Sequence, residues 1–169
     1  MAASIRVTDD LPKLQPMFKR LAKLGGNPEP LLAKIASYGE SSTRERFSTQ
    51  KSPDGQRWKP SLRAQLRGGK TLTKDTHLGD SITPSTDGNR AQWGSNRIYA
   101  AIHQFGGTIT PKNSSALRFQ IPGLGWITRK SVTLPARPFL GISSDDLDEI
   151  MTMVRVHIRD LTASTPGGA

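Results

Sequence analysis

The sequence contains no cysteine, which excludes disulfide bonds and metal sites built on thiolate ligands. Aromatic residues make up 6% and hydrophobic residues 34% of the 169 positions, which is little for a compact domain. Sixteen glycines and twelve prolines add turns, so we expect one modest core surrounded by long loops. No stretch approaches the roughly 18 apolar residues of a membrane-spanning helix, and the first ten residues lack the apolar run of a secretory signal. We therefore expect no membrane contact and a cytoplasmic site of action.

Acidic side chains are also few, because 14 Asp and Glu stand against 24 Lys and Arg. The resulting formal net charge of +10 predicts affinity for an anionic partner, either nucleic acid or an acidic protein surface. Phosphate attraction alone carries no base information, so the charge does not imply sequence-specific recognition.

Catalytic patterns are missing as well. We find no phosphate-binding loop, nucleophile triad or carboxylate pair at a catalytic spacing, and therefore expect no enzyme, no catalytic residue and no cofactor. His103 has no serine or cysteine motif beside it, so we interpret it as a structural residue that hydrogen-bonds strand backbone. Asp75, His77 and Asp80 lack the paired spacing of metal ligands, and we expect no metal site.

The order of the periodic segments predicts an α+β fold rather than alternating βαβ units. We expect a small antiparallel sheet packed with N-terminal, central and C-terminal helices, plus an extended β-arm. The single domain is predicted to cover residues 1–161, followed by a disordered tail at 162–169. The expected elements are a strand at 4–8, helices at 14–24 and 29–47, a hairpin whose strands end near 84 and resume at 91–93, a strand at 108–110, arm strands at 116–121 and 126–133, and a final helix starting at 143–146 and reaching 161.

The stretch from Tyr99 to Gly107 predicts a short buried helix at the centre of the chain. Tyr99, Ile102 and His103 have the three- and four-residue spacing of one helix face. Glycines then end the helix and return the chain to the sheet. We expect a structural motif made of Tyr99, Ile102, His103, Gln104, Gly106 and Gly107.

Basic residues are concentrated between residues 44 and 74, where nine Lys and Arg accompany only two acids. Few apolar residues lie there, so we expect an exposed and partly mobile segment. Two interpretations remain open: a solvated basic face, or a surface that faces DNA through salt-sensitive phosphate contacts. The candidate DNA-facing residues are Arg57, Lys59, Arg63, Arg67, Lys70 and Lys74.

The predicted β-arm carries four large apolar side chains. They either cover one face of their own sheet or pack on a neighbouring subunit, and the small expected core favours the second interpretation. The candidate subunit-interface residues are Phe119, Ile121, Trp126 and Ile127.

Five motifs occur in order between residues 40 and 145. They are Arg46-Phe47, Pro53-Asp54-Gly55-x-x-Trp58, Leu78-x-x-Ser81-Ile82, Gly94-Ser95-Asn96 with Tyr99-Ala100-x-Ile102-His103-Gln104-x-Gly106-Gly107, and Pro135-Ala136-Arg137-Pro138-Phe139-Leu140-Gly141. Together they resemble the phage virion morphogenesis family of Mu-like phages, which is related to tail completion proteins. One departure is His77, where the family tends to have glycine after Asp-Thr.

The resemblance implies a tail-completion or terminator-like fold and a structural assembly protein of the phage neck or tail terminus. Such a protein completes tails or joins them to heads, as a ring of identical subunits, often a hexamer, around the DNA path. Its partners would be itself, other neck, connector or tail tube proteins, and packaged DNA through nonspecific contacts. It would act in the host bacterial cytoplasm during assembly and then in the virion. The alternatives are a nonspecific nucleic-acid-binding protein or a transient capsid assembly factor.

Overall fold

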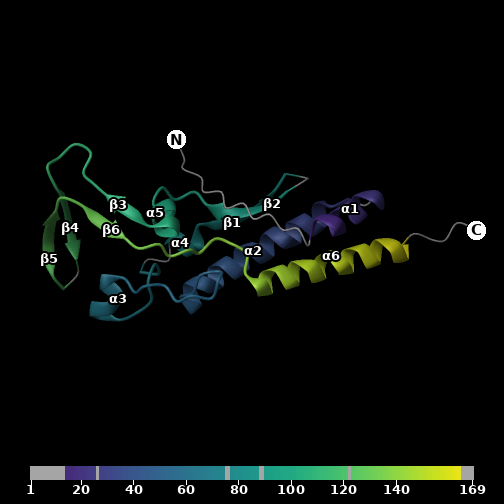
Figure 1. Cartoon of the computed structure of the whole chain (residues 1–169), viewed down its shortest axis with the longest axis horizontal. Coiled ribbons are helices and arrows are strands. Elements are labelled where there is room, and N and C mark those ends of the chain that lie inside the picture. Colours follow the sequence, from purple (N-terminus) through teal and green to yellow (C-terminus); the bar gives the residue numbers. More distant parts are fainter. Residues whose placement is uncertain (1–13, 26, 75–76, 88–89, 122, 165–169) are drawn as a thin grey trace, which may run out of the picture.

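The computed structural model describes residues 14–164 apart from residues 26, 75–76, 88–89 and 122. The molecule is elongated, with long helices at one end and a β-hairpin at the other (Figure 1). The strand that we expected at residues 4–8 lies outside the described residues.

Three helices form the helical end. They are α1 (Gln15–Lys23), α2 (Glu29–Thr49) and α6 (Ser144–Ser164), as the apolar spacing of the sequence predicts. Their facing stripes make a first core cluster of buried Leu14, Leu21, Leu31, Ile35, Ile150, Val154 and Ile158. Helix α6 continues through residues 162–164, which we had assigned to the tail, while residues 165–169 lie outside the described residues.

A two-stranded antiparallel sheet packs on α2. Strands β1 (Ile82–Thr86) and β2 (Ala91–Ser95) pair in a register that sets Ile82 opposite Ser95, as the predicted hairpin requires. Trp93 of β2 contacts both core clusters, and its indole lies against Gly39 of α2. A side chain at position 39 would collide with that ring, because a Cβ built there lies 2.4 Å from Trp93 Cδ2.

A second core cluster occupies the other half of α2, so the expectation of one modest core is wrong. Its buried residues come from segments far apart in the sequence: Phe47, Trp58, Leu78, Ile82, Ala100, Phe139 and Leu140. Phe47 is central to it, with ring centroids 5.5 Å from Trp58 and 5.4 Å from Phe139. The cluster is therefore built by tertiary contacts around one end of a long helix.

Short elements surround the second cluster. They are α3 (Leu62–Arg67), α4 (His77–Asp80), α5 (Ala100–Phe105), β3 (Gly107–Ile109) and β6 (Val132–Leu134). Strands β3 and β6 pair with each other, so the chain does not return from α5 to the β1–β2 sheet as expected.

The arm consists of β4 (Leu117–Ile121) and β5 (Gly125–Arg129), which form an antiparallel hairpin. The predicted continuous strand at 126–133 is wrong, because β5 ends at Arg129 and β6 begins at Val132 with a different partner. The predicted α+β class with antiparallel pairing is confirmed, and among the described residues the pairing is divided over three two-stranded sheets.

Candidate functional site

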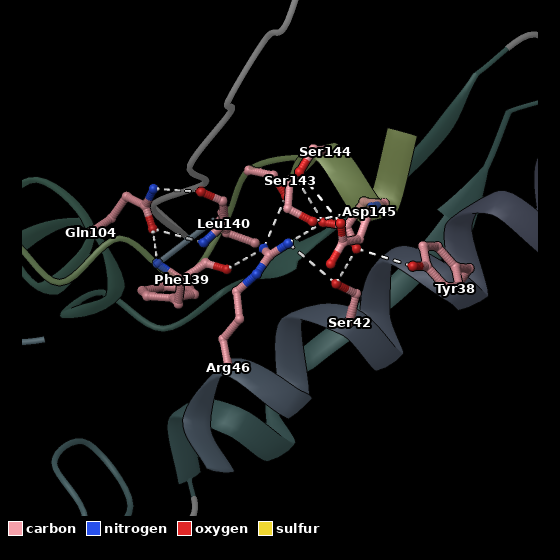
Figure 2. A network of polar contacts seen from close by, with 11 residues as sticks. Tyr38, Ser42, Arg46, Gln104, Phe139, Leu140, Ser143, Ser144 and Asp145 are labelled. Carbon is pink, nitrogen blue, oxygen red and sulfur yellow. Dashed lines mark hydrogen bonds and ion pairs between the residues drawn. The ribbon is translucent and has the colours of Figure 1, made fainter. Parts of the chain in front are cut away.

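Arg46 of α2 is at the centre of a polar junction between α2, α6 and the segment 137–141 (Figure 2). Its Nη1 donates to the backbone carbonyls of Phe139 at 2.8 Å and Gly141 at 2.9 Å. Its Nη2 donates to Ser42 Oγ at 3.2 Å and forms an ion pair with Asp146 Oδ2. One guanidinium therefore joins three segments of the chain, which the planar fork of arginine donors makes feasible.

Asp146 is at the first turn of α6 and completes this junction. Its backbone N–H donates to Ser143 Oγ at 3.1 Å, and its Oδ2 accepts from the Ser143 backbone N–H at 2.7 Å, which is a reciprocal helix cap. Oδ1 accepts from Ser42 Oγ and from the Tyr38 hydroxyl. Burial alone would raise the pKa of Asp146, but hydrogen bonds from Ser42 and Ser143 and the charge of Arg46 outweigh it and lower the pKa below its usual value.

The pKa of Tyr38 shifts in the opposite direction. Burial, followed by the adjacent Asp146 carboxylate, raises the pKa of Tyr38 to about 12. The hydroxyl therefore remains a protonated donor to Asp146 at neutral pH.

Gln104 of α5 anchors the same segment from the other side. Its Oε1 accepts from the backbone N–H groups of Phe139 at 2.9 Å and Leu140 at 3.0 Å, and its Nε2 donates to the Leu140 carbonyl at 2.9 Å. Figure 2 shows Gln104 and Arg46 reaching this segment from opposite sides. Because the side chain is 5% exposed, these three bonds satisfy backbone groups that water does not reach.

The structure corrects our expectation for α5. It buries Ala100 and Gln104, whereas Tyr99 is 39% exposed and Phe105 is 62% exposed. The His103 Nδ1 atom is buried without a hydrogen-bond partner among the described residues, so the expected bond from that atom to strand backbone is not formed. Burial, followed by the charge of Arg137, lowers the pKa of His103 and favours the neutral imidazole.

Two glycines of the quoted motifs allow close backbone approach. Gly106 has a φ of +70°, and a Cβ there would lie 2.6 Å from the backbone nitrogen of Ala136. Gly141 has a φ of +145°, and a Cβ there would lie 2.7 Å from Pro53 Cγ. The five motifs therefore converge on the second core cluster and its polar junction, although up to about 100 residues separate them.

The basic segment, residues 44–74, is packed more closely against the second core cluster than we expected. Gln50 ends α2 in a left-handed conformation, and its side chain exchanges hydrogen bonds with the backbone of Thr71 at 2.6 and 3.0 Å. Trp58 is 5% exposed and donates through Nε1 to the Pro138 carbonyl at 2.9 Å. These contacts attach the segment to the second core cluster, so the expectation of an exposed segment is wrong for Ser52 and Thr71, which are buried.

Of the six candidate DNA-facing residues, Arg57, Lys59, Arg67, Lys70 and Lys74 are exposed. Arg63 is half-buried and donates to the Lys70 carbonyl. Arg67 lies beside the turn of the β4–β5 hairpin, because a Cβ built on Gly123 would be 3.6 Å from its Nε. Arg63 and Arg67 belong to α3, which lies at the same end of the molecule as the β4–β5 hairpin (Figure 1).

The four candidate interface residues do not share one face of the arm. Phe119 pairs with Ile127 and lies on the same face as Ile121, and all three are half-buried. Trp126 pairs with Gln120 on the opposite face, is 63% exposed, and lies with its ring centroid 5.0 Å from the Arg118 guanidinium carbon. The arm therefore presents two distinct surfaces, one apolar and one with an arginine–tryptophan pair.

The described part of the chain has neither a cluster of metal ligands nor a membrane-spanning helix. No group of three His, Asp or Glu residues there has a metal-binding arrangement, and Asp75 itself lies outside it. Within the same residues no helix is both long and apolar enough to cross a bilayer.

The contacts made by Arg46, Asp146 and Gln104 were not predicted from the sequence. Two signals were present: the Ser143-x-x-Asp146 spacing typical of a helix cap, and an arginine beside Phe47 on an otherwise apolar helix face. The long-range partners of these side chains were not predictable, because they lie 35 to 108 residues away.

A profile of the phage virion morphogenesis family matches residues 9–159. The chain is 33% identical over 141 residues to the Mu-like prophage FluMu G protein 2 of Haemophilus influenzae, covering 83% of this chain and 86% of that protein. It is 32% identical over 129 residues to the putative capsid assembly protein G of Escherichia phage Mu, covering 70% and 71%. No solved structure matches the chain significantly.

The family profile spans both core clusters, the polar junction and the arm. The resemblance that the five motifs indicated is confirmed at the level of the family. The chain belongs to the phage virion morphogenesis family.

Proposed function

We propose that this protein is a structural component of the phage neck or tail terminus, where it completes tails or joins them to heads. Membership of the virion morphogenesis family supports a role in particle assembly. The observation that carries the finer proposal is the β4–β5 hairpin, which projects from the end of the molecule opposite the long helices (Figure 1). An isolated two-stranded hairpin is marginally stable in water, so a projecting one is best explained by a partner that covers it.

The protein acts in this proposal as a ring of identical subunits. Each arm packs on the next subunit, which is a heterologous contact that closes when repeated by rotation. In this proposal the exposed cations Arg57, Lys59, Arg67 and Lys70 meet packaged DNA or an acidic partner ring. Nonspecific phosphate contacts suit a ring around DNA, because they weaken with salt and do not depend on sequence.

A second candidate function is a transient role in capsid assembly. It is favoured by the similarity to the putative capsid assembly protein G of Escherichia phage Mu. In this case the protein acts before DNA packaging and is absent from the finished particle.

Electron microscopy of lysates from a phage with a stop codon in this gene tests both candidates. Full heads beside free tails, or overlong tails, support the neck or tail-terminus role. Absent or aberrant heads support the capsid assembly role instead. Normal infectious particles overturn both, and a plasmid copy of the wild-type gene is the control that restores assembly.

A further inference from the structure

The arm end of the molecule combines exposed apolar side chains with exclusively basic charge. We define the arm end as α3 together with the β4–β5 hairpin. Its exposed apolar residues are Leu62, Leu66, Leu124 and Trp126, which are 45% to 63% exposed. Residues 55–74 and 88–144, which contain both parts of the arm end, have no Asp or Glu. Such a surface fits an apolar partner surface edged with carboxylates.

Exposed aromatic and arginine side chains are typical of interface anchors. Trp126 is 63% exposed, and the Arg118 guanidinium lies 5.0 Å from its ring centroid. Tryptophan and arginine are the residue types that most often dominate binding energy at protein interfaces. Exposed leucines nearby have no role in phosphate contact, so a protein partner explains the arm end better than nucleic acid does.

The complementary surface is present elsewhere in the same chain. Four of the 14 acidic residues fall within residues 145–149, in the first turns of α6. Asp145, Asp148 and Glu149 are exposed, whereas Asp146 is used by the polar junction. Asp145 and Glu149 are four residues apart, and Val156 follows seven residues later on the same helix face.

A groove between α2 and α6 continues this acidic face. It has a volume of about 200 Å³, with Leu31, Met153 and Val156 as its apolar lining and Glu149 at its rim. Val156 is 40% exposed. Lys34 and Asp160 also line the groove, so its negative charge comes from Glu149 and Asp160, with Asp145 and Asp148 on the neighbouring turn of α6.

We propose that the arm end of one copy docks on the α2–α6 groove of a second copy, with Trp126 on its apolar lining and Arg118 beside Glu149. This inference rests on the proposed ring and specifies its subunit contact. The two surfaces differ and lie on one molecule, so each copy offers an arm and a groove. Such a contact is heterologous and propagates from copy to copy.

Charge-reversal substitutions in the purified full-length chain test this contact. Arg118→Glu and Glu149→Lys each place like charges together, and each is expected to raise the concentration needed for self-association by about tenfold or more. The double variant Arg118→Glu/Glu149→Lys restores the opposite pairing and is expected to assemble like the wild type. An equimolar mixture of the two single variants is expected to assemble as well, because alternating copies also match their charges. Analytical ultracentrifugation and native mass spectrometry measure the result.

Arg90→Glu is the matched control, because Arg90 is exposed on the β1–β2 hairpin outside both surfaces. It is expected to leave assembly unchanged. Circular dichroism of every variant checks that the fold is retained.

Several outcomes overturn the inference. If both single variants assemble normally, Arg118 and Glu149 do not meet. The same conclusion follows if both fail to assemble and neither the double variant nor the mixture recovers. A wild-type chain that stays monomeric at all concentrations shows that the arm end does not dock on a second copy. If Arg118→Glu loses DNA binding while its assembly is unchanged, the partner of the arm end is nucleic acid. The proposed function is decided separately by the phage lysates, which do not depend on association of the purified chain.

Discussion

Arg46 of α2 and Asp146 of α6 form a buried ion pair although 100 residues separate them in the sequence. Their side chains are 8% and 7% exposed, and the arginine also holds the carbonyls of Phe139 and Gly141. This pair connects the two long helices with the segment that closes the second core cluster. Its contribution is therefore to position three segments at once.

Removing one member of this pair is expected to destabilise the protein strongly. Arg46→Met leaves the Asp146 carboxylate buried without its counterion and two carbonyls without their donor, at a cost of about 3–5 kcal/mol. Urea unfolding measures the change. Arg159→Met is the control, because its ion pair with Asp160 is exposed and contributes at most about 1 kcal/mol. Equal effects of the two changes would contradict the role of the junction.

Stability is expected to fall on acidification through Asp146. The folded-state pKa of Asp146 lies below that of an unfolded aspartate, about 3.9, so the folded chain binds this proton less readily. The stabilisation is therefore fully present above that value and is lost as the pH falls through the lower folded pKa. Chemical unfolding between pH 2 and 6 is expected to show a shallower decline for Asp146→Asn than for the wild type.

Asp54 also contributes to the pH dependence, so the pH curve of the wild type must be compared with that of Asp146→Asn. A hydrogen bond from Ser52 also lowers the pKa of Asp54, so the wild-type curve contains more than one group. Identical pH slopes for the wild type and Asp146→Asn would show that Asp146 does not contribute.

Gln104 is expected to matter more for stability than its neighbour His103. Gln104→Ala removes three hydrogen bonds and leaves buried backbone groups of Phe139 and Leu140 without partners, at a cost of about 1–3 kcal/mol per unsatisfied group. His103→Gln removes a ring whose buried Nδ1 has no partner among the described residues, so its effect is expected to be smaller. Thermal unfolding of both variants gives the order, and the reverse order would refute this account of α5.

A methyl group at position 39 is expected to disturb the contact between α2 and β2. The added Cβ of Gly39→Ala lies 2.4 Å from the Trp93 ring, which forces a shift that costs about 1–3 kcal/mol. Gly79→Ala is the matched control, since its Cβ meets Phe47 Cγ at an ordinary 3.6 Å. Chemical unfolding compares the two, and a neutral effect of Gly39→Ala would show that the Trp93 ring moves freely.

Two tryptophans are expected to separate folding from assembly. Trp126→Ala removes a 63% exposed ring and should change the free energy of unfolding by less than about 1 kcal/mol while weakening self-association. Trp58→Ala removes a ring that is 5% exposed in the second core cluster, at a cost of about 3–5 kcal/mol. Chemical unfolding measures the stability of both variants, and sedimentation measures their self-association. An unfolded Trp126→Ala monomer would contradict the interpretation of the arm.

Local spacing in the sequence determined α1, α2, α6 and the β1–β2 hairpin, whereas α3 was not predicted. The apolar stripe of α6 predicted its buried residues Ile150, Val154 and Ile158, because a helix places residues three and four apart on one face. The five ordered motifs resembled the virion morphogenesis family, to which the chain belongs. Both inferences depend on residues close together in the chain.

Only the tertiary structure decided which long-range partners those residues find. Gln104 rather than His103 anchors α5, and β6 pairs with β3 rather than continuing the arm. Each of these outcomes depends on contacts between segments distant in sequence, and periodicity carries no information about them. The spacing of residues in the sequence predicts which face of a helix or strand a side chain occupies. The residue that it contacts there is set by how the whole chain packs.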